Sequence, residues 1–99
     1  MTTFPAIEAY RAELQATDYR PLDNPALAEV RRRYAASKHS SAIEGIHPSP
    51  EQEAFFDMLH EMRVPQGLAD KYSDRFLHER IIGPALARQA EREDVQAHA

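Results

Sequence analysis

Helix start and stop signals divide this chain into short segments, and they constrain its fold more than any other feature. Asn24 followed by Pro25 is typical of a helix start, because Asn caps free N–H groups and proline fits the first helical position. Gly45 can adopt the left-handed backbone that ends a helix. Ser49 with Gln52 three residues later forms a capping box, which marks another start. We therefore expect a long helix over 26–45 and a further helix from Ser49.

Two other segments also have the pattern of helices. The first has Thr3 as its cap and Pro5 just inside, and it runs to about Gln15 with a weak apolar stripe. Within 49–82, after the break "RVPQG", a fourth helix carries apolar residues until "IIGP" at 81–84 terminates or kinks it. The charged segment 85–99 is either a frayed extension or a disordered tail.

Strand signals are almost absent, because no segment alternates apolar and polar residues over several positions. The sequence therefore predicts an all-α fold, a small bundle of three to four helices in a single domain over 1–99. The long second helix contributes few apolar residues to a core, so we expect the bundle to wrap a partner protein. The predicted core is Phe55, Phe56, Leu59, Met62, Tyr72, Phe76, Leu77 and Ile81, joined by Leu27, Val30, Tyr34 and Ile43.

The composition excludes several classes of function. The 99 residues contain no cysteine, which excludes disulfides, thiolate zinc sites and a cysteine nucleophile and suits a reducing cytoplasm. No apolar run approaches the roughly 20 residues that span a bilayer, and no export signal precedes the first helix. Five scattered histidines lack zinc spacing, and three distant glycines form no phosphate loop. We predict no catalytic residues, no metal site, no cofactor and no membrane association.

A basic cluster at Arg31, Arg32 and Arg33 is the one feature that suggests nucleic acid. Consecutive helical residues point about 100° apart, so these three cannot form one patch alone. The net charge of −4 also argues against binding dominated by phosphates. We interpret the arginines as solvated side chains, partly paired with Asp23 and Glu29. DNA contact stays an alternative that the sequence does not favour.

Glu44 stands at an unfavourable position, immediately before the glycine that ends the second helix. The C-terminus of a helix carries about half a negative charge, so an acidic residue there loses about 0.3–1 kcal/mol. No basic residue lies between Lys38 and Arg63 to offset this loss. Ser40 is four residues earlier and so lies one turn away on the same side. Without further information, Glu44 is an ordinary surface acid.

The stretch "SSAIEG" resembles the inhibitory motif of Fic-domain proteins, which is Ser or Thr, three residues, Glu, and then Gly or Asn. Here these positions are Ser40, Glu44 and Gly45. A long helix before the motif, "IHPSPE" after it and a following helix extend the likeness over roughly residues 27–82. In this arrangement the chain is similar to the small VbhA-type antitoxins, which inhibit a separate Fic toxin.

The resemblance implies a concrete mechanism. Fic enzymes transfer AMP from ATP to a hydroxyl side chain, and their own catalytic motif, which begins His-Pro-Phe, is missing here. Glu44 would reach into the toxin's nucleotide site and pair with the arginine that otherwise binds the ATP γ-phosphate. Ser40 would support that contact, and Gly45 would end the helix where it meets the site. ATP is then contacted only indirectly, through the toxin.

We accordingly expect a cytoplasmic bacterial antitoxin with Ser40, Glu44 and Gly45 as the inhibitory motif. Two alternatives stay open: the regulatory segment of a self-inhibiting Fic enzyme, and a DNA-binding autorepressor. Met1, the tail after Gly83 and the missing catalytic motif favour a free-standing protein. The residues expected to bind the toxin are Tyr34, Ser37, Ser41, Ile43, Phe55 and Phe56.

Overall fold

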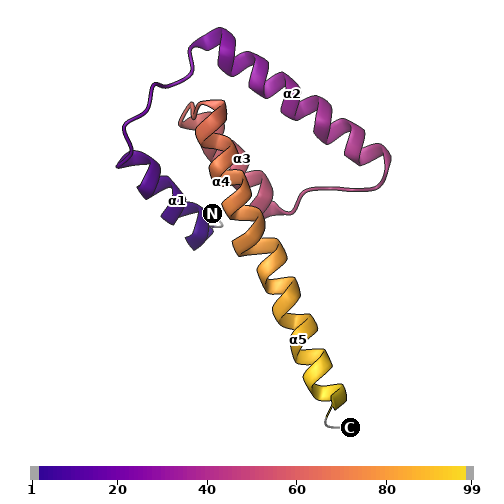
Figure 1. Ribbon diagram of the computed structural model, residues 1–99. Helices are drawn as coiled ribbons and strands as arrows, with labels where there is room; N and C mark the ends of the chain where they lie inside the picture. The colour runs from indigo at the N-terminus through magenta and orange to yellow at the C-terminus, as the bar shows by residue number, and fades with distance from the viewer. Residues whose placement is uncertain (1–2, 98–99) are drawn as a thin grey trace. The chain divides into compact units, whose positions relative to one another are not determined.

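The computed structural model describes the backbone of residues 3–97 and the side chains of residues 3–93 (Figure 1). Across these residues the chain consists of helices and connecting turns, without a β-strand. The all-α prediction is therefore confirmed, and so is the number of helices, four in the described range when the last three elements are counted as one. In chain order the elements are α1 (Pro5–Gln15), α2 (Asn24–Ile43), α3 (Pro50–Glu61), α4 (Gln66–Phe76), η1 (Leu77–Ile82) and α5 (Gly83–Ala97).

The start of α3 follows the predicted capping chemistry. Ser49 Oγ accepts a hydrogen bond from the Gln52 N–H at 3.2 Å, and Gln52 Oε1 accepts one from the Ser49 N–H at 2.8 Å. Both bonds satisfy donors that a helix start otherwise leaves free. The capping box is confirmed.

The other two starts differ from the prediction by one residue. Asp23, not Asn24, caps α2, and its Oδ1 accepts from the Ala26 N–H at 2.9 Å. A carboxylate at this position also interacts favourably with the positive end of the helix dipole. At α1 the cap position belongs to Phe4 rather than Thr3, and no side chain bonds to the free N–H groups there.

The end of α2 is a Schellman motif. Gly45 has φ of 80°, its N–H donates to the Ala42 carbonyl at 3.0 Å, and the Ile46 N–H donates to the Ser41 carbonyl at 2.9 Å. Glycine adopts this left-handed backbone without steric penalty, as the sequence indicates.

The end of α3 has the same pattern without a glycine. Arg63 takes the left-handed position with φ of 54°, and the Val64 N–H donates to the Leu59 carbonyl at 3.1 Å. A side chain in this conformation costs about 1–2 kcal/mol. Other bonds of Arg63 offset that cost.

These bonds tie the end of α3 to the segment before α2. The Arg63 guanidinium donates to the Leu22 carbonyl at 3.1 Å and to Asn24 Oδ1 at 2.9 Å, and the Arg63 carbonyl accepts from the Leu22 N–H at 2.9 Å. Tyr19 adds a hydroxyl bond to the Met62 carbonyl at 2.8 Å. The α1–α2 connection is therefore anchored to the end of α3 at Tyr19 and Leu22.

The chain forms two compact units, unit 1 (Met1–Gln66) and unit 2 (Gly67–Ala99). In unit 1, α1 packs against α3, and Tyr10 meets Phe55 edge to face with ring centroids 5.9 Å apart. Three residues of α1 are buried, so this helix contributes more to the core than its weak apolar stripe predicts. The buried apolar side chains of unit 1 are Ile7, Tyr10, Leu14, Leu27, Phe55, Met58, Leu59 and Val64.

Unit 2 is helical throughout its described length. Of the two outcomes predicted for "IIGP", termination of the helix is wrong, because α4, η1 and α5 follow one another without interruption (Figure 1). For segment 85–99 the sequence leaves two alternatives, a helical extension or a disordered tail. Its described part, 85–97, is helical. Leu77 and Ile81, which the sequence assigns to the core, are 40% and 36% exposed. Tyr72 and Phe76 are buried as predicted.

A π-helical segment, η1, replaces the predicted break. The Gly83 N–H donates to the carbonyl of His78, five residues earlier. A Cβ added at Gly83 would lie 2.7 Å from that carbonyl oxygen, so only glycine fits this close approach. Proline inside a helix clashes with the carbonyl four residues before it, and the wider turns of η1 directly precede Pro84.

Candidate partner-binding site

The predicted inhibitory motif occupies the exposed end of α2. Ser40 lies in the last turns of the helix, Glu44 is its C-terminal cap residue, and Gly45 begins the turn that follows. All three residues are exposed. Ile43 and Ile46 on either side of Glu44–Gly45 are 76% and 58% exposed. In the sequence, Glu44 therefore lies between two residues with exposed aliphatic side chains.

Glu44 has no partner for its charge within the described part of the chain. No hydrogen bond or ion pair involves its carboxylate there, and the last turn of α2 carries no basic residue. Lys38, the nearest cation along the helix, is engaged elsewhere, with Nζ 2.6 Å from Glu53 Oε1. The unfavourable interaction with the helix dipole is thus unrelieved in the isolated chain.

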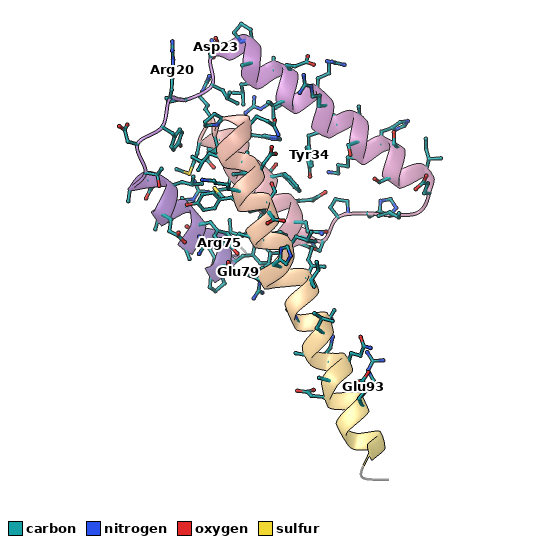
Figure 2. All side chains as sticks on the ribbon, viewed as in Figure 1. Arg20, Asp23, Tyr34, Arg75, Glu79 and Glu93 are labelled. Carbon is teal, nitrogen blue, oxygen red and sulfur yellow. The ribbon has the colours of Figure 1, made fainter. Side chains whose placement is uncertain are left out.

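An aromatic stack and one ion pair hold α2 against α3. The Tyr34 ring lies 4.9 Å from the Phe56 ring and 5.4 Å from the His60 ring, centroid to centroid. Figure 2 shows Tyr34 on the α3 side of α2. The Lys38–Glu53 pair lies one turn further along the same face. Apart from these contacts α2 is largely exposed, and Leu27 is its one buried residue.

Burial changes the titration of this stack. The pKa of the Tyr34 hydroxyl is raised, mainly because burial disfavours the phenolate. The pKa of His60 is lowered, first by burial and then by repulsion from Arg31. Tyr34 Oη is buried and finds no hydrogen-bond partner among the described residues.

Beyond the stack, α2, the 46–48 turn and α3 enclose a groove of about 360 Å³. Four of the predicted binding residues, Tyr34, Ser37, Ser41 and Phe56, line it. Glu44, Ser40 and Ile43 do not. The predicted residues thus fall into two neighbouring surfaces, the groove and the exposed end of α2. The groove is completed by residues that the sequence prediction missed: Lys38, Ile46, His47, Pro48 and Gln52.

Phe55 is the exception among the predicted binding residues. Its side chain is 0% exposed and packs edge to face on both Tyr10 and Phe56. We therefore assign Phe55 to the core of unit 1. The sequence did not separate it from Phe56 because the two are adjacent and only the position of α1 distinguishes them.

Two arginines of the basic cluster share one acid, Glu29. Glu29 accepts two hydrogen bonds from Arg32, at 3.0 and 2.6 Å, and one from Arg33 at 3.1 Å. These bonds lower the pKa of Glu29 to about 2. The predicted pairing with Glu29 is confirmed, whereas Asp23 caps α2 instead. Two of the three arginines thus already have a carboxylate partner.

Among the described residues, no group of three or more His, Asp or Glu side chains is arranged to hold a metal ion. None of the helices in that range has both the length and the apolar character needed to cross a bilayer.

No known protein family, characterised protein or solved structure matches the sequence or the fold.

Proposed function

We propose that this chain is an antitoxin that inhibits a Fic-domain adenylyltransferase in trans, with Glu44 inserted beside the ATP site of the toxin. The observation that carries the proposal is the exposed Glu44 carboxylate, which caps a helix at its negative end and has no cation among the described residues. Such a charge is unfavourable in the free chain. An arginine of a partner would turn this loss into a favourable ion pair.

The chemistry of inhibition follows from competition for that arginine. A guanidinium presents several planar donors whose geometry matches both a carboxylate and a phosphate. Glu44 would occupy the arginine that otherwise holds the γ-phosphate of ATP, and Ser40, one turn earlier, would support the contact. ATP can then still bind but with its α-phosphate displaced from the attacking hydroxyl, and small displacements reduce the rate by large factors.

The surroundings of Glu44 suit insertion into another protein. Ile43 and Ile46 would become buried on binding. Burial of apolar surface favours binding by about 25 cal/mol for each Å². The groove beside them, with Tyr34 and Phe56 in its wall, offers a second contact area on the same unit. The inhibitor would act in the bacterial cytoplasm, together with the toxin.

The proposal expects a neighbouring gene that encodes a Fic-domain protein, and co-expression of that protein with this chain tests it. We expect the two proteins to copurify, and the complex to show almost no AMP transfer from labelled ATP. Glu44→Gly should leave the complex intact and restore transfer, because contact area and inhibition reside in different residues. The matched control, Glu91→Gln, removes an exposed carboxylate of α5 and should keep the complex inactive.

Two results would contradict this function. The first is a failure of the wild-type chain to bind the Fic-domain protein. The second is a Glu44→Gly complex that stays as inactive as the wild type, which would show that inhibition does not depend on this carboxylate.

A further inference from the structure

An ion pair between α2 and α3 closes the loop on which Glu44 stands. Lys38 lies in the second half of α2, Glu53 lies in the first turn of α3, and Lys38 Nζ is 2.6 Å from Glu53 Oε1. The pair joins the two ends of segment 38–53, and Glu44 lies near the middle of that segment. The carboxylate is thus at the tip of a closed loop.

Local hydrogen bonds define the two corners of this loop but not its overall geometry. The Schellman motif at Gly45 fixes the backbone of Glu44 relative to α2. The capping box at Ser49 fixes the first turn of α3. Each motif involves only one helix and its adjoining turn, so neither sets the angle between α2 and α3. Contacts between the two helices have to set it.

The ion pair is the contact between these helices that lies closer to Glu44. The aromatic stack at Tyr34 holds the middle of α2. At 1.5 Å per residue Glu44 lies about 15 Å beyond Tyr34, so a tilt of only about 4° at the stack moves it by about 1 Å. Lys38 lies only about 9 Å from Glu44 along the axis. A second contact at Lys38 therefore opposes this tilt.

We propose that Lys38 and Glu53 are positioning residues for inhibition, which hold the end of α2 at the angle that Glu44 needs to reach its arginine. The inference rests on the function proposed above. Functional groups have to be held within about 0.5 Å of their productive position, and a contact already formed in the free chain lowers the cost of ordering on binding. Both side chains are half exposed, at 45% and 43%, so the expected effect is moderate.

Residual AMP transfer by the Fic-domain protein, measured with this chain in saturating excess, tests the inference. Saturation removes any contribution from weaker binding. Lys38→Glu places two carboxylates against each other and should raise the residual transfer about two- to fivefold. Glu53→Lys places two cations together and should have the same effect. Because the two substitutions change the net charge in opposite directions, net charge cannot explain a common increase.

The doubly reversed variant, Lys38→Glu with Glu53→Lys, should return the transfer to the wild-type level, because the pair forms again with reversed sign. A direct contact between Lys38 and the toxin would not be restored, since the cation is then on another helix. The matched control is Arg33→Glu, which makes the same charge change on α2. The ion pair of Arg33, 3.1 Å from Glu29, stays within the helix, so the transfer should not change. The far-ultraviolet circular dichroism of each variant verifies that the helices remain.

Three results would overturn the inference: unchanged transfer in both single variants, an equal increase with Arg33→Glu, and no recovery in the doubly reversed variant. If Glu44→Gly restores transfer in the same assay, such a result contradicts only the positioning role. A Glu44→Gly complex that stays inactive would contradict the proposed function and this inference together.

Discussion

Arg63 and Asn24, thirty-nine residues apart, join the end of α3 to the start of α2 through a guanidinium–amide bond of 2.9 Å. Arg63 makes this bond from a left-handed backbone, where a side chain is disfavoured by about 1–2 kcal/mol. The backbone of Arg63 therefore destabilises unit 1, while its side-chain bond stabilises it.

Substitutions at Arg63 separate the two effects. Arg63→Ala keeps the strained backbone and removes the side-chain bonds to Leu22 and Asn24. We therefore expect its free energy of unfolding, measured in urea, to be about 1–3 kcal/mol lower than that of the wild type. Arg63→Gly loses the same bonds but relieves the strain, and it should be about 1 kcal/mol more stable than the alanine variant. Arg20→Ala, in the exposed α1–α2 connection (Figure 2), is the control and should have little effect. Equal stability of the alanine and glycine variants would contradict the strain.

Two tyrosines of unit 1 should respond in opposite ways to loss of the hydroxyl. Tyr34 Oη is buried without a partner among the described residues, so Tyr34→Phe should raise the free energy of unfolding by up to about 1 kcal/mol. Tyr19 donates to the Met62 carbonyl at 2.8 Å, and Tyr19→Phe should lower it by about 0.5–1.5 kcal/mol. Thermal or urea unfolding of the two single variants measures both. A loss of stability in Tyr34→Phe would show that its hydroxyl is bonded.

His60 makes the stability of unit 1 dependent on pH. Burial and Arg31 lower its pKa in the folded state, while Asp57 opposes the shift. Above about pH 7.5 the imidazole is neutral in both states, and it contributes no dependence. As the pH falls through 6.5, the unfolded chain binds a proton before the folded chain does, so the free energy of unfolding decreases.

We therefore expect wild-type stability to fall more steeply between pH 7.5 and 5.5 than that of His60→Gln. Urea unfolding at several pH values measures the two slopes. His39→Gln, at an exposed histidine of α2 away from the aromatic stack, is the matched control. Parallel slopes for the wild type and His60→Gln would exclude this contribution.

What the sequence predicts correctly here is local chemistry. The Ser49–Gln52 capping box and the turn at Gly45 depend on residues within a few positions of one another, and both form as expected. The position of Glu44 at the exposed end of α2 follows directly from that turn.

What escapes prediction depends on distant partners. The left-handed backbone of Arg63 is maintained by bonds to Leu22 and Asn24, which no local pattern reveals. The burial of Phe55, unlike that of Phe56, depends on contact with Tyr10 in α1. The π-helical segment has a local signal in Gly83–Pro84, but the same pair is also typical of a helix end. The groove was not predicted, because it is formed jointly by α2, the 46–48 turn and α3, and the sequence does not show how these segments lie together.

Glu44 sets stability against the proposed function. Its charge lies at the negative end of α2 with no basic residue in the last turn, so Glu44→Gln should stabilise the isolated chain by about 0.3–1 kcal/mol. The same substitution should abolish inhibition of the Fic-domain protein. Glu51→Gln removes a carboxylate from the first turn of α3, where the dipole favours negative charge, and should destabilise the chain by a similar amount.

Urea unfolding at low salt and at about 1 M salt separates this dipole effect from other causes, because salt screens the interaction of exposed charges. The stabilisation by Glu44→Gln and the destabilisation by Glu51→Gln should both become smaller at high salt and keep their opposite signs. A Glu44→Gln variant less stable than the wild type would show that the carboxylate already has a favourable partner in the free chain. A cation of another protein would then not be needed to explain why a carboxylate stands at this position.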